Sequence, residues 1–211
     1  MANFNAALAQ CPLVAILRGI KPNEVIEIGC CLVDAGFTLI EVPLNSPDPL
    51  NSISKLANNF GNDTVIGAGT VLRTSEISAV ANAGGQIIIS PNTNIDVIVE
   101  TKRLGLISMP GIATTTEAFA ALGTGADALK MFPAEGLSPS VLKAMRAVLP
   151  QNVPILPVGG IGVNNMEAYV AAGAQGFGIG SSLYKRGKTT VEIAHDARLM
   201  ISAWKACRKA T

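Results

Sequence analysis

Short apolar runs alternate along the chain with longer segments in which apolar and polar residues follow a helical period. Apolar runs of about five residues, bounded by turn residues, are typical of strands buried on both faces. Helix-start signals, such as the hydroxyl and carboxylate of Thr74-Ser75-Glu76, lie between these runs. Eight strands are predicted, at Leu13–Leu17, Leu39–Val42, Thr64–Gly67, Gln86–Ile89, Leu106–Met109, Ala128–Phe132, Ile155–Val158 and Phe177–Ile179.

Glycines, together with one turn at Pro150, divide this pattern at intervals that average about 23 residues. Glycine is favoured after the last turn of a helix, because the left-handed backbone there penalises other residues. The glycines that follow a helical segment and precede a strand are Gly36, Gly61, Gly84, Gly105, Gly125 and Gly173. Eight repeated βα units predict a closed (β/α)₈ TIM barrel, an α/β fold, with residues 1–211 as a single domain. An open doubly wound sheet is the alternative, but the chain has no GxGxxG fingerprint.

Composition narrows the classes of partner. Hydrophobic residues make up 49% of the chain and charged residues 15%, with 16 Lys and Arg against 15 Asp and Glu, for a net charge of +1. This balance predicts no binding to nucleic acid or to an acidic membrane. The low charge content favours an oligomer. No basic signal region follows Met1 and no apolar run is long enough to span a bilayer, so we expect a cytoplasmic protein.

Neither a metal site nor a disulfide framework is expected. The four cysteines, Cys11, Cys30, Cys31 and Cys207, have no CxxC spacing and are predicted to be reduced core residues. The single histidine, His195, lies in a helical segment between charged neighbours and is predicted to be solvated. We therefore expect neither a metal nor an organic cofactor.

Charged residues at the carboxyl ends of the predicted strands are the first candidates for catalysis, because barrel active sites are assembled there. These residues are Arg18, Glu41 and Lys130. Lys130 interrupts an apolar strand, where an ammonium is costly and a neutral amine is a nucleophile suited to Schiff-base formation with a ketone. A salt bridge to Glu41, or a lysine that reaches out to solvent, is the structural alternative.

Glu41 stands among apolar neighbours, which should raise its pKa toward that of a working acid and base. The alternative is a carboxylate that only neutralises Arg18 or Lys130. Two further features, Gly159-Gly160 and Gly180-Ser181, follow the last two predicted strands, where barrels frequently bind phosphate through backbone N–H groups. Ordinary tight turns are the alternative for these glycines.

Together these strand ends resemble one family, the class I pyruvate aldolases that cleave 2-keto-3-deoxy sugar acid phosphates. The resemblance rests on four motifs and spans about residues 14–184: Ala15-Ile16-Leu17-Arg18-Gly19, Glu41-Val42-Pro43-Leu44-Asn45-Ser46, Gly67-Ala68-Gly69-Thr70-Val71-Leu72 and Ala128-Leu129-Lys130-Met131-Phe132-Pro133-Ala134-Glu135.

The resemblance implies a role for each matching residue. Lys130 matches the Schiff-base lysine and Glu41 the acid and base. The implied substrate-binding residues are Thr70, Pro91, Phe132, Gly159, Gly160, Gly180 and Ser181. The family's phosphogluconate branch has an arginine where Asn45 stands and a threonine where Val158 stands, so both positions resemble the galactonate branch. Arg18 then becomes the candidate for binding the substrate carboxylate.

The resemblance implies cleavage of a phosphorylated keto-deoxy sugar acid to pyruvate and glyceraldehyde 3-phosphate, by a homotrimer. Three alternatives stay open. The chain could act on the phosphogluconate or hydroxyglutarate substrates of the same family, it could be a non-catalytic sugar-phosphate-binding barrel, or it could be a cofactor-free isomerase or epimerase. The binding barrel would not require a buried Lys130, and the isomerase would form no imine.

Overall fold

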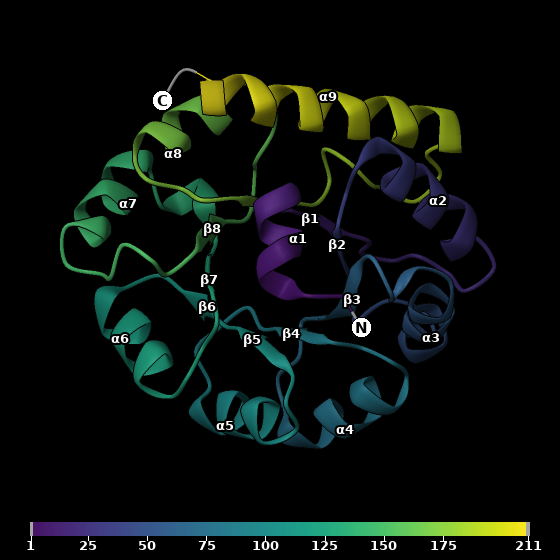
Figure 1. Cartoon of the computed structure of the whole chain (residues 1–211), viewed down its shortest axis with the longest axis horizontal. Helices are drawn as coiled ribbons and strands as arrows, with labels where there is room; N and C mark the ends of the chain where they lie inside the picture. Colours follow the sequence, from purple (N-terminus) through teal and green to yellow (C-terminus); the bar gives the residue numbers. More distant parts are fainter. Residues whose placement is uncertain (1, 210–211) are drawn as a thin grey trace.

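The computed structural model describes residues 2–209, in which parallel strands are surrounded by helices (Figure 1). The strands are β1 Leu13–Ile16, β2 Leu39–Pro43, β3 Val65–Gly69, β4 Ile87–Ile89, β5 Ile107–Met109, β6 Gly111–Ile112, β7 Leu129–Met131, β8 Ile155–Pro157 and β9 Phe177–Ile179. The helices are α1 Phe4–Gln10, α2 Val25–Ala35, α3 Pro49–Phe60, α4 Thr74–Asn82, α5 Ile95–Arg103, α6 Thr115–Gly123, α7 Pro139–Arg146, α8 Met166–Ala171 and α9 Thr190–Lys209.

All strand pairs are parallel, and they form two sheets. One sheet has the order β5-β4-β3-β2-β1-β9, and the other has the order β6-β7-β8. An isolated parallel bridge between Val158 and Gly178 links β8 to β9. Between β5 and β6 lies only Pro110, which has no N–H to donate to a ladder. Each of the eight predicted strands is present to within two residues, whereas β6 was not predicted.

Helix α1 was not predicted either, and it covers the amino-terminal ends of the strands. The hydroxyl of Thr38, the residue before β2, donates to the carbonyls of Ala7 and Cys11 at 2.9 and 3.0 Å. In Figure 1, α1 lies over the middle of the ring of strands. This helix closes one end of the interior and leaves the carboxyl ends of the strands for a site.

Side chains alternate between two separate hydrophobic clusters along each strand. The interior cluster joins Ala7 of α1 to one residue or more from most strands: Val14, Leu39, Val65, Ile87, Ile89, Met109, Ala128 and Leu156. The intervening strand residues, such as Ile40 and Leu129, pack outward against the surrounding helices. Because every strand is buried on both faces, the strands read as continuous apolar runs in the sequence.

Five of the six glycines predicted to end helices adopt the left-handed backbone: Gly36, Gly84, Gly105, Gly125 and Gly173. Gly61 was expected to do the same, and that prediction is wrong, because its φ is −65°. A Cβ at Gly61 would lie 2.5 Å from the carbonyl oxygen of Ala57. Close approach to α3, and not backbone conformation, therefore explains the glycine at this position.

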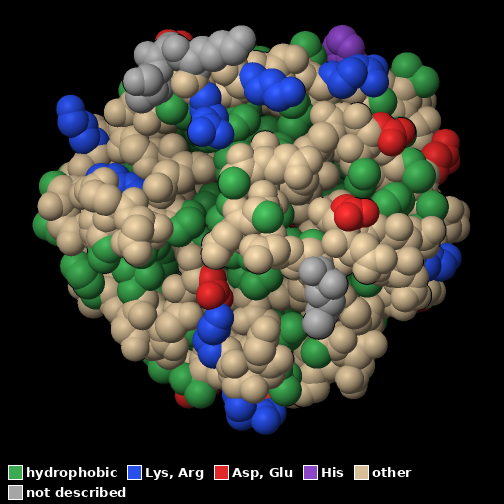
Figure 2. All heavy atoms as spheres, viewed as in Figure 1, with side chains coloured by type: hydrophobic (Ala, Val, Ile, Leu, Met, Phe, Trp, Pro, Cys, Tyr) green, Lys and Arg blue, Asp and Glu red, His purple; other side chains and the backbone are tan. Residues whose placement is uncertain are grey.

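Charged side chains are scattered over the face that carries α1, among hydrophobic and uncharged atoms (Figure 2). This distribution agrees with the net charge of +1. Within residues 2–209, no helix is both long enough and apolar enough to cross a membrane.

Arg146 connects the loops that precede β8 and β9, although the residue is buried. Its guanidinium donates to the carbonyls of Gly173 and Val153, both at 2.9 Å, and to the side chain of Gln175. Burial lowers the pKa of the guanidinium, and these acceptors offset the cost of removing the charge from water. The bonds hold in place the starts of the two strands that carry the glycine pairs.

We expect Arg146→Met to lower the free energy of unfolding by about 2 to 4 kcal/mol, because it leaves the partly buried carbonyl groups of Gly173 and Val153 without a donor. Urea unfolding followed by circular dichroism measures the change. The control is Arg103→Met, in which the lost ion pair to Glu100 lies on the surface, and its midpoint should stay near that of the wild type. Equal effects of the two substitutions would show that the hydrogen bonds of Arg146 do not contribute to the free energy of unfolding.

Candidate active site

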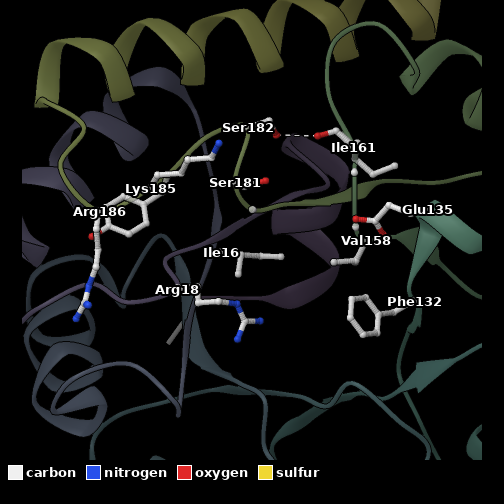
Figure 3. A pocket seen from close by; sticks show the side chains of 14 residues that line it. Ile16, Arg18, Phe132, Glu135, Val158, Ile161, Ser181, Ser182, Lys185 and Arg186 are labelled. Atoms are coloured by element: carbon white, nitrogen blue, oxygen red, sulfur yellow. Dashed lines mark hydrogen bonds between the residues drawn. The ribbon is translucent and has the colours of Figure 1, made fainter.

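A pocket of about 410 Å³ opens at the carboxyl ends of β1, β7, β8 and β9 (Figure 3). It contains seven of the residues predicted for the site: Arg18, Phe132, Val158, Gly159, Gly160, Gly180 and Ser181. Ile16 and Val158 belong to the apolar part of its wall, while Ser181 and Ser182 supply hydroxyl groups. The loops that follow four separate strands are thus brought together around one cavity.

Lys130 lies on the interior face of β7 and is not among the residues that line this pocket. Its neighbours Leu129 and Met131 belong to the outer hydrophobic cluster, so alternation turns Lys130 inward. Only 3% of the residue is exposed. The Nζ atom lies 5.0 Å from the centre of the Phe132 ring, and it has no hydrogen bond or ion pair among the described residues. The predicted alternative of a structural salt bridge to Glu41 is therefore wrong.

Glu41 lies on the interior face of β2, between β1 and β3 in the sheet. Only 1% of the residue is exposed, and its Oε2 atom has no hydrogen-bond partner. Burial raises the pKa of this carboxyl, and the positive charges of Lys130 and Arg18 partly oppose that increase. The predicted rise in pKa is thus confirmed, and desolvation is its main cause. A carboxyl with a raised pKa is suited to both accepting and donating a proton.

The Glu41 carboxyl occupies space at the end of β3 that is free because Gly69 has no side chain. A Cβ at Gly69 would lie 2.5 Å from Oε2 of Glu41, so glycine leaves the space that the carboxyl occupies. The next residue, Thr70, has a φ of 58°, a left-handed conformation that is unfavourable for a branched side chain. Strain of this kind is typical of functional sites.

Pro91 follows β4, and its backbone packs tightly against Gly111 of β6. Thr70 and Pro91 are both partly exposed at strand ends, but neither lines the pocket of Figure 3. The structure therefore leaves these two predicted residues on the opposite side of Glu41 from the glycine pairs.

Arg18 extends from the end of β1 into the pocket (Figure 3). Its Nη1 atom donates to Oδ1 of Asn45 at 2.9 Å. The side chain is exposed, so the guanidinium retains further donors for a ligand. Arg18 and Asn45 were singled out from different motifs of the sequence, and the structure brings them into contact.

Backbone conformation distinguishes the first glycine pair. Gly159 and Gly160 have φ values of 107° and 64°, which only glycine adopts readily. The Glu135 side chain lies directly against both residues, so a Cβ at either one would collide with it. Across the pocket, the Ser182 hydroxyl donates to the carbonyl of Ile161 at 2.7 Å, which ties the two glycine-containing loops together (Figure 3).

Several residues of the pocket were not predicted from the sequence. Glu135 closes the quoted aldolase motif, and Tyr184, Lys185 and Arg186 follow the second glycine pair. The Tyr184 hydroxyl donates to Glu24 at 3.1 Å, and burial raises the pKa of this phenol. Adjacent cations directly after a phosphate-type loop are the signal that would have identified Lys185 and Arg186.

Within residues 2–209, no group of three or more His, Cys, Asp or Glu side chains is arranged to bind a metal ion. His195 lies on α9, outside the pocket of Figure 3. Its neighbours include Asp196 of the same helix and Lys188, which precedes the helix.

Comparisons with known proteins agree with this arrangement. The family model of the KDPG and KHG aldolases matches residues 4–195. A probable 2-dehydro-3-deoxy-6-phosphogalactonate aldolase of Rhizobium meliloti is 45% identical over 195 residues, covering 92% of each chain. The 2-dehydro-3-deoxy-6-phosphogalactonate aldolase of Escherichia coli is 41% identical over 194 residues, covering 92% of this chain and 95% of the relative.

A solved structure named as native KDPGal superimposes with a TM-score of 0.93 at 40% sequence identity, covering 95% of this chain and 97% of the other. The match in sequence therefore extends to the whole fold. Since the family model spans nearly all of the chain and two relatives exceed 40% identity, the resemblance seen in the motifs is confirmed. The chain belongs to the KDPG and KHG aldolase family.

Proposed function

We propose that this protein is a class I aldolase that cleaves 2-dehydro-3-deoxy-6-phospho-D-galactonate to pyruvate and D-glyceraldehyde 3-phosphate. One observation carries the proposal: an amine and a carboxyl, those of Lys130 and Glu41, are both buried at the carboxyl ends of the strands and are not paired with each other. Unpaired polar groups in such positions are costly to fold, which favours a catalytic use for them. The names of the two relatives above support the choice of substrate.

Lys130 is the proposed nucleophile. Once deprotonated, its amine attacks the C2 ketone to give a carbinolamine, and loss of water then gives an iminium. The positive nitrogen withdraws electrons from C3. Glu41, directly or through a water molecule, removes the proton of the C4 hydroxyl, and the electrons of the C3–C4 bond move into the iminium to form an enamine. Glyceraldehyde 3-phosphate is released at this step.

Glu41 is also the proposed acid for the second half of the reaction. The protonated carboxyl returns its proton to C3 of the enamine, which regenerates an iminium, and water then hydrolyses this iminium to free pyruvate and the Lys130 amine. The same group is proposed for both proton transfers because burial raises its pKa and makes its protonated form more accessible.

The remaining predicted residues bind the substrate in this proposal. Arg18, oriented by Asn45, binds the carboxylate through its free donors. Thr70 and Pro91 border the pyruvate end, and the Phe132 ring lies 5.0 Å from the Lys130 Nζ atom. The phosphate is proposed to bind the backbone N–H groups of Gly159, Gly160, Gly180 and Ser181, which line the pocket at the ends of β8 and β9.

We further propose that the strands form one closed eight-stranded barrel in a single domain, residues 1–211. The bridge between Val158 and Gly178 supports closure on one side. On the other side, Lys130 N–H donates to the carbonyl of Pro110 at 2.9 Å, so β7 pairs with the segment that joins β5 to β6.

A homotrimer is proposed as the assembly. Exposed apolar side chains on α5 and beside α4 support self-association, and they include Leu72, Ile95 and Val99. Asn94 Nδ2 donates to the carbonyl of Leu72, which brings the loop before α4 next to the start of α5. These side chains are therefore neighbours on one surface.

Replacing Glu41 separates proton transfer from imine formation. With Glu41→Gln, exchange of the pyruvate methyl protons in D₂O should slow by about a hundredfold or more, because an amide cannot shuttle a proton. Proton NMR measures this rate. The control is Glu27→Gln on the exposed side of α2, which should exchange at the wild-type rate. Normal exchange in Glu41→Gln would remove Glu41 from the role proposed here.

Val158 tests the choice of C4 epimer. Its methyl groups face the pocket and offer no hydrogen bond to a C4 hydroxyl. With pyruvate release measured on both epimers, we expect kcat/KM of the wild type to favour the galactonate by about ten- to a hundredfold, since an unsatisfied buried hydroxyl costs roughly 1 to 3 kcal/mol. Val158→Thr should narrow that ratio. Equal values in the wild type, or an unchanged ratio in the variant, would refute this account of selectivity.

A further inference from the structure

Three cationic side chains follow β9 in one short loop, and they differ in what they contact. Lys188 Nζ donates to the Asp196 carboxylate at 2.6 Å and to the carbonyl of Leu183 at 3.1 Å. Arg186 Nε donates to the carbonyl of Gly19 at 2.9 Å. The ammonium of Lys185 has no hydrogen bond or ion pair to any residue that the structure describes, although its backbone carbonyl accepts from the N–H of Lys188 at 3.2 Å. Two of these cations therefore hold the loop in place, and the third is available to a ligand.

The residues on both sides of Lys185 are held in place by hydrogen bonds. Tyr184 is buried and bonded to Glu24, while Arg186 is held at Gly19. In Figure 3 the Lys185 side chain extends from this anchored loop along the pocket, toward Ser181 and Ser182. Its ammonium thus lies on the same side of the cavity as Gly180 and Ser181.

The charged residues that line the pocket indicate a role for Lys185. Glu135 lies against Gly159 and Gly160, so a phosphate bound at that pair meets a carboxylate of like charge. Backbone N–H groups contribute only partial charges, which do not cancel this repulsion. Arg18 lies at the opposite end of the proposed substrate, bonded to Asn45. Arg186 also lines the pocket, but its Nε donates to the carbonyl of Gly19. In Figure 3 its guanidinium points away from Ser181, whereas the Lys185 side chain points toward it. Lys185 is therefore positioned to supply a full positive charge at the phosphate end.

We propose that Lys185 is a specificity-determining residue that binds the substrate phosphate and offsets Glu135, so that the enzyme selects phosphorylated over unphosphorylated keto-deoxy sugar acids. The inference rests on the proposed function, since it assumes that the phosphate occupies the glycine loops. It adds a side-chain charge to a subsite otherwise made of backbone and hydroxyl groups.

The test compares Lys185→Met with the wild type on 2-dehydro-3-deoxy-6-phosphogalactonate and on its unphosphorylated counterpart. We expect KM for the phosphorylated substrate to rise about five- to thirtyfold, as for the loss of a charge-assisted hydrogen bond that is partly open to solvent. The kcat should stay within about twofold, because the phosphate is bound equally in the ground and transition states. On the unphosphorylated substrate, kcat/KM should change by less than about twofold.

Two further variants make the result specific. Lys143→Met removes an exposed lysine of α7 outside the pocket and should leave both substrates unaffected. Lys185→Arg keeps the charge and should restore most of the discrimination. Equal losses on both substrates in Lys185→Met, or an unchanged preference for the phosphorylated one, would overturn the assignment of Lys185.

Exchange of the pyruvate methyl protons separates this failure from a failure of the proposed function. Pyruvate carries no phosphate, so all the Lys185 variants should exchange at the wild-type rate if the amine and carboxyl act as proposed. Absence of exchange in the wild type would refute the aldolase mechanism and the Lys185 assignment together. Normal exchange with unchanged phosphate preference in Lys185→Met would refute the Lys185 assignment alone.

Discussion

The alternation of side chains along parallel strands is the constraint on which the site depends. Each strand places every second residue in the interior, and near the amino-terminal ends that interior is filled by apolar side chains and covered by α1. The same alternation carries Glu41 to the interior two residues after Leu39, and Lys130 two residues after Ala128. An amine and a carboxyl therefore lie in a buried layer above apolar side chains, where burial raises the pKa of the carboxyl.

This arrangement has a cost that the rest of the structure must offset. The Glu41 carboxyl has one oxygen without a partner, and burial makes its charged form unfavourable. The strands around it contribute two hydrophobic clusters, and the loops that shape the pocket are fixed by specific polar contacts such as those of Arg146 and Ser182. A rigid frame of this kind holds groups that are individually destabilising in the geometry that the proposed reaction requires.

Much of this could be predicted from the sequence, for identifiable reasons. Strands buried on both faces leave uninterrupted apolar runs, so all eight predicted strands were found, and a lysine within such a run is conspicuous. Helix α1 was missed because seven residues with little periodicity give a weak signal. Gly61 was misassigned because sequence spacing does not distinguish a close backbone contact from a left-handed turn. Lys185 and Arg186 were missed although they are adjacent cations after a phosphate-type loop, and only the fold distinguishes the two, because Arg186 is bonded to Gly19 and the Lys185 ammonium is not bonded to a described residue.

The central claim is that the interior amine of Lys130 is the covalent nucleophile, and reductive trapping tests it most directly. The protein is incubated with ¹³C-labelled pyruvate and borohydride, digested, and mapped by mass spectrometry. The account predicts a three-carbon adduct on the peptide that contains Lys130, and its loss in Lys130→Ala together with cleavage activity. An adduct on a different lysine, or no adduct in a preparation that still cleaves the substrate, would contradict it.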